Sequence, residues 1–262
     1  MTDTASSVDA LRAAHARVLD RIAAACGRVG RDPNEVELVA VSKTVDAARL
    51  REAVAAGMVK LGENRVQEGE AKRPEVPGAR WELVGPLQSN KARKAIETFE
   101  RIQTVDSVAL AERLDRIAGE IPVVGRYPVL LQVNVDDDPA KSGFSPDAVA
   151  AAMDALLALA YLEVQGLMTV GRVADSEADA RATFRSLREL SGRLRSRSPG
   201  LGPNLSMGMS DDLELAVEEG ATIVRVGRAI FGERPHRHGA GPLDHYHPPG
   251  RPPGDGPRPA DC

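Results

Sequence analysis

Short apolar runs alternate with amphipathic segments over residues 1–234. The runs are apolar at most positions, as from Val129 to Val135, which is typical of parallel strands covered on both faces. The pattern predicts strands over residues 37–42, 58–62, 81–85, 102–105, 128–135, 162–168, 204–207 and 222–226. Periods near 3.6 residues predict helices over 8–29, 46–56, 66–73, 89–99, 108–118, 146–158, 176–197 and 211–218, and a helical turn over 227–231.

Each predicted strand is followed by a helix. Eight such units in about 200 residues fit an α/β fold, the (β/α)8 TIM-type barrel, here with a leading N-terminal helix. A doubly wound open sheet has the same alternation and stays open as the alternative. We expect one barrel domain over residues 1–234.

The chain changes character after Arg234. Residues 235–262 contain eight prolines and five glycines in 28 residues, with few aliphatic side chains. Such a segment buries too little apolar area to offset the entropy of ordering it, so we expect a disordered tail. Four of the five histidines lie there, but a flexible histidine-rich tail is a weak indication of metal binding, and we expect no metal site.

Charge and composition exclude several classes of function. The 34 Lys and Arg residues against 38 Asp and Glu give a net charge of −4, so no global positive field attracts nucleic acid or an anionic membrane. No run reaches the roughly 18 apolar residues of a membrane span, and the N-terminus lacks the apolar segment of a signal peptide. With only two cysteines, we expect a cytoplasmic protein.

Functional groups in such a barrel lie just after the C-terminal ends of the strands. Lys43 directly follows the first strand, and a partly desolvated lysine at the mouth supplies a nucleophilic amine for a Schiff base. A solvated strand-end lysine is the alternative. Small and hydroxyl residues at 206–210, with Arg225 and Gly227, predict a phosphate site after strands seven and eight. The alternative is that residues 210–212 cap the next helix.

A series of short motifs in fixed order then resembles the pyridoxal phosphate homeostasis protein family, with its fold-type III barrel. The motifs are Ala40-Val41-Ser42-Lys43-Thr44, Gly62-Glu63-Asn64, Gly85-Pro86-Leu87-Gln88-Ser89-Asn90-Lys91, Lys141-Ser142-Gly143, Gly166-Leu167-Met168, Leu205-Ser206-Met207-Gly208-Met209-Ser210-Asp211, Val224-Arg225-Val226-Gly227 and Ile230-Phe231-Gly232. The resemblance covers roughly residues 10–234.

The resemblance implies that Lys43 holds pyridoxal 5′-phosphate (PLP) as an internal aldimine. It also implies that the phosphate is held by Ser206, Gly208, Arg225 and Gly227, and that the ring is lined by Asn64 and Met168. Two positions depart from the family pattern: Glu82 stands where a histidine is usual, and Arg65 replaces a frequent tyrosine. Glu82 could alter the local charge near the barrel core.

The resemblance further implies a PLP carrier or buffer in intracellular PLP homeostasis, with apo PLP-dependent enzymes as recipients and no established turnover. A fold-type III amino-acid racemase or lyase is the alternative, and a class I aldolase is more distant. A two-base racemase needs a second acid or base opposite the lysine, often tyrosine. Tyr127 and Tyr161 both precede their predicted strands, away from the mouth. The racemases carry a separate dimerisation domain that finds no counterpart here, so we expect a monomer.

Overall fold

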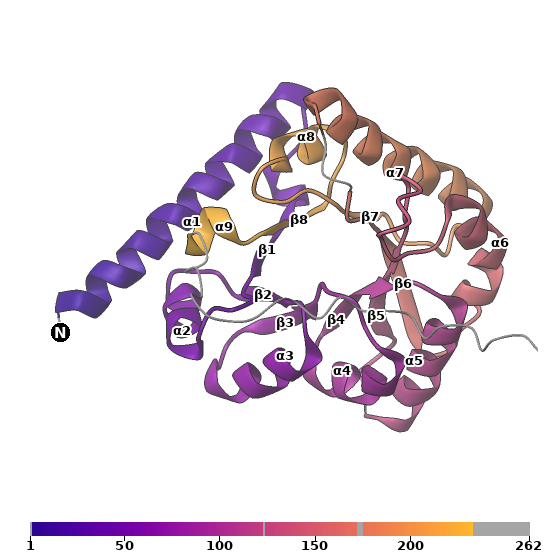
Figure 1. Cartoon of the computed structure of the whole chain (residues 1–262), viewed down its shortest axis with the longest axis horizontal. Helices are drawn as coiled ribbons and strands as arrows, with labels where there is room; N and C mark the ends of the chain where they lie inside the picture. Colours follow the sequence, from indigo (N-terminus) through magenta and orange to yellow (C-terminus); the bar gives the residue numbers. More distant parts are fainter. Residues whose placement is uncertain (1, 123, 172–174, 233–262) are drawn as a thin grey trace, which may run out of the picture.

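The predicted barrel is confirmed: eight parallel strands pair in sequence order, and the last pairs with the first to close the ring (Figure 1). The structure is a computed structural model that describes residues 2–122, 124–171 and 175–232. The strands are β1 (Glu37–Val41), β2 (Lys60–Glu63), β3 (Arg80–Leu83), β4 (Arg101–Val105), β5 (Tyr127–Gln132), β6 (Leu162–Met168), β7 (Asn204–Ser206) and β8 (Ile223–Val226). The open-sheet alternative is therefore wrong.

Helices form the outer ring, and the predicted helical segments are confirmed. The first begins six residues before its predicted start, and the other ends shift by at most three residues. They are α1 (Thr2–Val29), α2 (Ala47–Ala55), α3 (Val66–Lys72), α4 (Ala92–Thr98), α5 (Val108–Glu120), α6 (Pro146–Leu157), α7 (Glu177–Arg197), α8 (Leu213–Glu218) and α9 (Arg228–Phe231). Short 3-10 turns are η1 (Pro33–Glu35), η2 (Arg73–Glu75) and η3 (Ser89–Lys91). The predicted helix over 89–99 is thus a 3-10 turn followed by α4.

Side-chain caps fix where several helices begin. Asp46, Ser107, Ser145 and Ser176 each accept a hydrogen bond from the backbone N–H three residues later, at the starts of α2, α5, α6 and α7. Such a cap satisfies one of the N–H groups that has no partner within the helix. The βα loops therefore end at defined residues.

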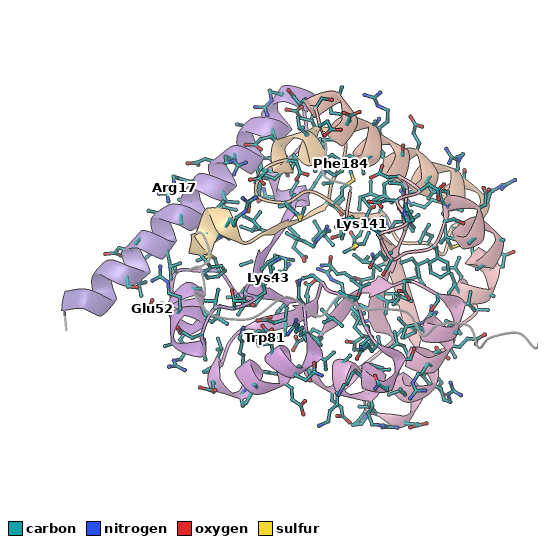
Figure 2. The ribbon with its side chains drawn as sticks, viewed as in Figure 1. Arg17, Lys43, Glu52, Trp81, Lys141 and Phe184 are labelled. Atoms are coloured by element: carbon teal, nitrogen blue, oxygen red, sulfur yellow. The ribbon has the colours of Figure 1, made fainter. Side chains whose placement is uncertain are left out.

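Alternate strand residues face two different environments. Leu61, Trp81 and Leu83 belong to the large apolar cluster that includes residues of the surrounding helices, and Trp81 lies on the helix side of the ring in Figure 2. A second, smaller cluster comprises Val39, Leu130, Met168 and Ile223 from four strands, with Val84 directly after β3. Since side chains alternate along a strand, this second cluster is the apolar part of the barrel interior.

Charged side chains occupy the interior at the N-terminal ends of the strands. Arg101 donates to both carboxylate oxygens of Glu82, over 2.9 and 2.6 Å, and also bonds Glu37. Lys60 Nζ donates to the other Glu37 oxygen over 2.5 Å. Burial raises the pKa of Glu82, and the charge of Arg101 opposes that shift. Glu82, where the sequence departs from the family pattern, is thus one member of a buried ion cluster.

The leading helix α1 lies along the outside of the barrel against α2, α8 and α9 (Figure 1). Arg21 on α1 pairs with Glu214 of α8 over 2.5 Å and donates to the backbone oxygen of Ser210 over 2.9 Å. Cys26 on the same helix is fully buried. Among the helices that the structure describes, none has the length and apolarity for a membrane crossing.

The proposed boundary at Arg234 and the tail at 235–262 lie outside the described residues. The barrel closes through β8, and α9 contributes buried Ile230 before that boundary. We therefore expect a protein ending at Arg234 to melt within about 2 °C of the full chain, as for a change below about 1 kcal/mol.

Differential scanning calorimetry of the two proteins tests this prediction. A protein ending at Gly227, which loses α9 and Ile230, is the control and should melt at a clearly lower temperature. A large drop on removal of the tail alone would show that the tail packs on the barrel.

Candidate functional site

The C-terminal ends of the strands form the barrel mouth, and most residues singled out in the sequence lie there. Lys43 follows β1, Asn64 follows β2, and Gly227 follows β8. A Cβ on Gly227 would lie 3.2 Å from the backbone oxygen of Val41, and one on Gly85 only 2.3 Å from that of Asn64. The loops after neighbouring strands are thus in contact, and the two glycines permit this close approach.

Lys43 lies between an anchored strand end and a strained turn. Ser42 is buried, and its Oγ donates to Glu63 Oε1 over 2.8 Å, while Lys72 Nζ donates to the Ser42 backbone oxygen over 3.1 Å. Thr44 has φ +66°, a conformation that costs a β-branched residue about 1–3 kcal/mol. Lys43 is partly buried, and Figure 2 shows it at the β1 side of the barrel opening. This backbone fixes the starting point of the lysine side chain.

Glu63 is a site residue whose role the sequence reasoning missed. Its side chain is fully buried, and Oε1 also accepts from Lys72 Nζ over 2.6 Å. Within the described part of the chain, Oε2 has no hydrogen-bond partner. Burial raises the pKa of Glu63, and the bonds from Lys72 and Ser42 oppose this. The sequence did contain a signal for this role, because Glu63 is a carboxyl residue between Gly62 and Asn64 directly after a predicted strand.

Arg225 places a positive charge inside the barrel. It is 5% exposed; its Nη1 donates to Ser206 Oγ over 2.5 Å and its Nη2 to the backbone oxygen of Thr169 over 2.8 Å. Burial lowers its pKa to about 10, and the charge of Asp212 opposes that shift. Within the described ranges, no carboxylate forms an ion pair with it. A buried cation held only by neutral oxygens is costly, so this site suits an anionic ligand.

The Ser206 side chain forms hydrogen bonds with two other side chains of the protein. Its side chain is fully buried, and Oγ donates to Gln103 Oε1 over 2.6 Å while accepting from Arg225. Gln103 was not singled out in the sequence. The available signal was the alternation of side chains along β4: Arg101 and Gln103 are two residues apart, and such positions share a face of the strand.

Two glycines and a hydroxyl line the loops after β7 and β8. Gly208 has φ +89°, and a Cβ there would lie 2.4 Å from Ala216 Cβ. Gly227 is the N-cap of α9, and Ser210 Oγ accepts from Ala229 N over 3.4 Å. The helix-capping alternative for residues 210–212 is wrong in part: Asp212 occupies the N-cap of α8 but bonds Met209 N instead of that helix. Small residues thus bring these two loops together.

The two residues expected to line a ring differ in depth. Met168 is fully buried in the interior cluster with Val39 and Leu130, so it forms part of the floor beneath the mouth. Asn64 is partly buried and contacts the β3 loop through its backbone. The predicted set Lys43, Asn64, Met168, Ser206, Gly208, Arg225 and Gly227 thus shares one end of the barrel. Within it, Arg225 bonds Ser206 Oγ through its side chain and the Gly208 oxygen through its backbone N–H, over 3.0 Å.

The fold places the other candidate acids, bases and amines at different distances from the barrel mouth. Tyr127 begins β5, at the N-terminal end of the barrel, and its hydroxyl donates to the Phe99 backbone oxygen over 2.7 Å. Tyr161 is 50% exposed and precedes β6. Lys141 follows β5, on the same end as Lys43 (Figure 2), and Lys91 ends η3. The described tyrosines are therefore both remote from the mouth.

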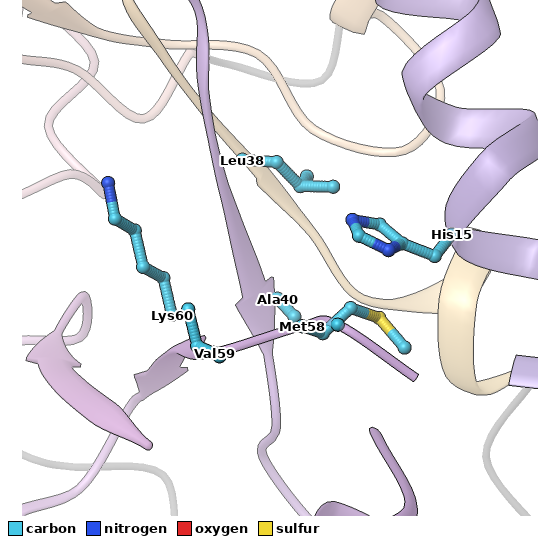
Figure 3. Close-up of a pocket in the computed structure, with 7 residues that line it drawn as sticks. His15, Leu38, Ala40, Met58, Val59 and Lys60 are labelled. Carbon is cyan, nitrogen blue, oxygen red and sulfur yellow. The ribbon is translucent and has the colours of Figure 1, made fainter. Parts of the chain in front are cut away.

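A separate cavity of about 190 Å³ lies between α1 and the strands β1 and β2 (Figure 3). It is lined by His15, Leu38, Ala40, Gly57, Met58, Val59 and Lys60. His15 is therefore away from the mouth, as expected. Across the described ranges, histidine, cysteine and carboxylate side chains form no cluster of three or more that could hold a metal ion.

Comparison with known proteins gives a consistent result. The family model for the N-terminal domain of alanine racemase matches residues 17–235. The pyridoxal phosphate homeostasis protein of Pseudomonas aeruginosa is 44% identical over 223 residues, which cover 84% of this chain and 94% of that protein. That of Escherichia coli K12 is 39% identical over 225 residues, with the same two coverages.

Solved structures show the same fold. PipY of Synechococcus elongatus, solved with PLP bound, is 44% identical, with a TM-score of 0.72 over 82% of this chain and all of that one. Alanine racemase of Clostridium difficile is 17% identical, with a TM-score of 0.67 over 87% of this chain and 57% of that one. The racemase likeness, at that identity, concerns the fold alone.

The close approach at Gly85 gives a prediction for the mouth. Gly85→Ala forces Asn64 and the β2 loop to move, because its Cβ would overlap the Asn64 backbone. We expect a loss of about 1–3 kcal/mol in the free energy of unfolding, measured by urea denaturation. Gly27→Ala, in α1 with no atom within 4 Å of its Cβ, is the control and should gain about 0.5–1 kcal/mol. Equal effects would show that the loops adapt freely.

Proposed function

Because this chain belongs to the pyridoxal phosphate homeostasis protein family, we propose that it binds PLP at the barrel mouth and serves in PLP homeostasis. In this proposal it is a cofactor carrier or buffer in the cytoplasm. Its partners are PLP and the apo PLP-dependent enzymes that receive it, and it works as a monomer. The identity of 44% to a homeostasis protein over most of both chains supports the family role.

One observation carries the assignment of the ligand: the buried Arg225 guanidinium. Among the described residues its side chain donates to the neutral oxygens of Ser206 and Thr169 and forms no ion pair, so a phosphate monoester supplies a negative charge in direct contact with it. Gly208 and Gly227 leave room for backbone N–H groups to approach the same anion. The residues present therefore fit PLP. We assign the phosphate to Gly208, Arg225 and Gly227 directly and to Ser206 through Arg225, because the Ser206 hydroxyl hydrogen is donated to Gln103.

Lys43 is our candidate for the covalent attachment. PLP, when bound, supplies an aldehyde that reacts with amines and a ring that withdraws electrons. The anchored Ser42 and the strained Thr44 hold the Lys43 backbone at the mouth, which reduces the entropy lost when the side chain is fixed. Asn64 and Met168 are our candidates for the ring contacts, from the loop and from the floor.

The distribution of acids and bases favours a carrier over a racemase. Tyr127 is bonded at the N-terminal end of the barrel and Tyr161 lies on the outer surface, so neither described tyrosine can act as a second base opposite Lys43. Turnover of L- to D-amino acids by the purified protein, followed by chiral chromatography, would instead support a racemase.

Lys43→Ala tests the covalent attachment. We expect this variant to stay folded, because a partly exposed strand-end lysine contributes little packing, and to lose the visible absorption band of lysine-linked PLP. Borohydride reduction followed by peptide mass mapping of the wild type should place the label on Lys43. The Lys141→Ala control should keep both the band and the label. A label on Lys141 or Lys91 in the Lys43→Ala protein would move the attachment site.

Arg225→Gln tests the phosphate contact. Loss of a charge-assisted hydrogen bond worth about 1.5–3 kcal/mol should raise the Kd for PLP about tenfold to hundredfold. Absorbance titration of cofactor-free protein measures this, with Lys141→Ala as the control that should change Kd less. Equal Kd values for the wild type and Arg225→Gln would show that the phosphate lies elsewhere.

A further inference from the structure

A buried chain of polar side chains crosses the barrel interior beneath the proposed cofactor site. It runs from Arg225 on β8 through Ser206 on β7 and Gln103 on β4 to Glu82 on β3. The Ser206–Gln103 and Gln103–Glu82 bonds are both 2.6 Å long. Each of the four residues is at most 5% exposed. Water has little access to these four side chains, so they depend on one another for hydrogen bonds.

The charge of Glu82 decides how the Gln103 amide is turned. Donors face both oxygens of Glu82: Arg101 Nη2 faces Oε1, and Arg101 Nε and Gln103 Nε2 face Oε2. An ionised carboxylate only accepts hydrogen bonds. The Gln103 amide therefore presents its NH₂ group to Glu82, which leaves the amide oxygen facing the other way, toward Ser206.

The amide orientation in turn decides the role of the Ser206 hydroxyl. The single hydroxyl hydrogen is donated to Gln103 Oε1, so the Ser206 oxygen is free to accept from Arg225 Nη1. A guanidinium has five N–H donors. The Ser206 oxygen and the Thr169 carbonyl bind one N–H on each terminal nitrogen, so they fix the plane of the guanidinium.

We propose that Gln103 is a positioning residue of the cofactor site, which sets the Ser206 hydroxyl as an acceptor and thereby orients Arg225 toward the PLP phosphate. This inference rests on the proposed function. Gln103 touches no cofactor atom in this scheme; it acts through Ser206. Glu82, the residue that departs from the family pattern, sets which group donates and which accepts in each hydrogen bond from Gln103 to Arg225.

The interior offers a matched control at Glu37. Glu37 bonds Arg101 and Lys60 in the same buried ion cluster as Glu82, but it has no bond to Gln103. Glu37→Gln and Glu82→Gln thus remove the same charge from the same cluster, and only the second frees the Gln103 amide to turn over.

The test compares Gln103→Leu, Glu82→Gln, Glu37→Gln and the swap Glu82→Gln/Gln103→Glu. The swap puts an amide at 82 and a carboxylate at 103, so Ser206 again faces an acceptor. Absorbance titration gives the Kd for PLP and for pyridoxal, which lacks the phosphate, and calorimetry checks that each variant is folded.

We expect Gln103→Leu and Glu82→Gln to raise the Kd for PLP about threefold to tenfold, the equivalent of one hydrogen bond, and to change that for pyridoxal less than twofold. The Kd for PLP of the swap variant should be within about twofold of the wild-type value, and so should that of Glu37→Gln. A merely structural role would weaken the binding of both ligands equally.

Three results would overturn the inference: wild-type affinity for PLP in Gln103→Leu, equal losses for PLP and pyridoxal, or a swap no better than Glu82→Gln. Each leaves the proposed function intact, because the wild type still binds PLP. A wild-type protein that binds no PLP would instead refute the proposed function itself, together with this inference.

Discussion

The buried charge of Arg225 is the constraint around which the barrel interior is organised. A guanidinium removed from water must find acceptors or a counter-charge, since desolvation disfavours the charged form. Ser206 and Thr169 supply two neutral oxygens, and the lowered pKa of about 10 reflects the burial that remains uncompensated. The protein thus maintains a cation at the end of the barrel that faces its functional loops.

At the opposite end of the interior, buried charges are balanced by ion pairs. Arg101 lies between Glu37 and Glu82, and Lys60 pairs with Glu37. Arg101 and Glu37 each have two ionic partners, so the charges of the cluster are shared among four side chains. Gln103 connects this neutralised cluster to Ser206. The described interior therefore has an ion-paired cluster at one end, a cation without a described ion pair at the other, and hydrogen bonds of defined direction between them.

The mouth depends on backbone placement as much as on side chains. Lys72 on α3 bonds both Ser42 and Glu63, so a helix outside the ring holds the end of β1 from which Lys43 extends. Gly85 lets the β2 loop approach to a distance that a side chain would forbid, and Gly227 permits a tight approach to the Val41 oxygen. These contacts orient the loops before any ligand arrives, and preorganisation of this kind reduces the entropic cost of binding.

The sequence by itself determined the order of strands and helices and predicted where the site lies. Its alternation of apolar runs and amphipathic segments specified eight βα units, because strand and helix periods are local properties of the chain. The motifs placed Lys43 and the glycines after strand ends and Arg225 one residue before the end of the last strand, where a barrel brings functional groups together.

Only the tertiary structure decided which polar groups meet inside the barrel. Gln103 and Ser206 are 103 positions apart in sequence, yet they share a hydrogen bond of 2.6 Å. The pairing depends on the depth and direction of inward side chains on non-adjacent strands, β4 and β7, which no local pattern encodes. For the same reason, the sequence could not reveal that Glu63 would be locked beneath α3 or that Glu82 would set the direction of the buried hydrogen bonds. Those outcomes required closure of the ring.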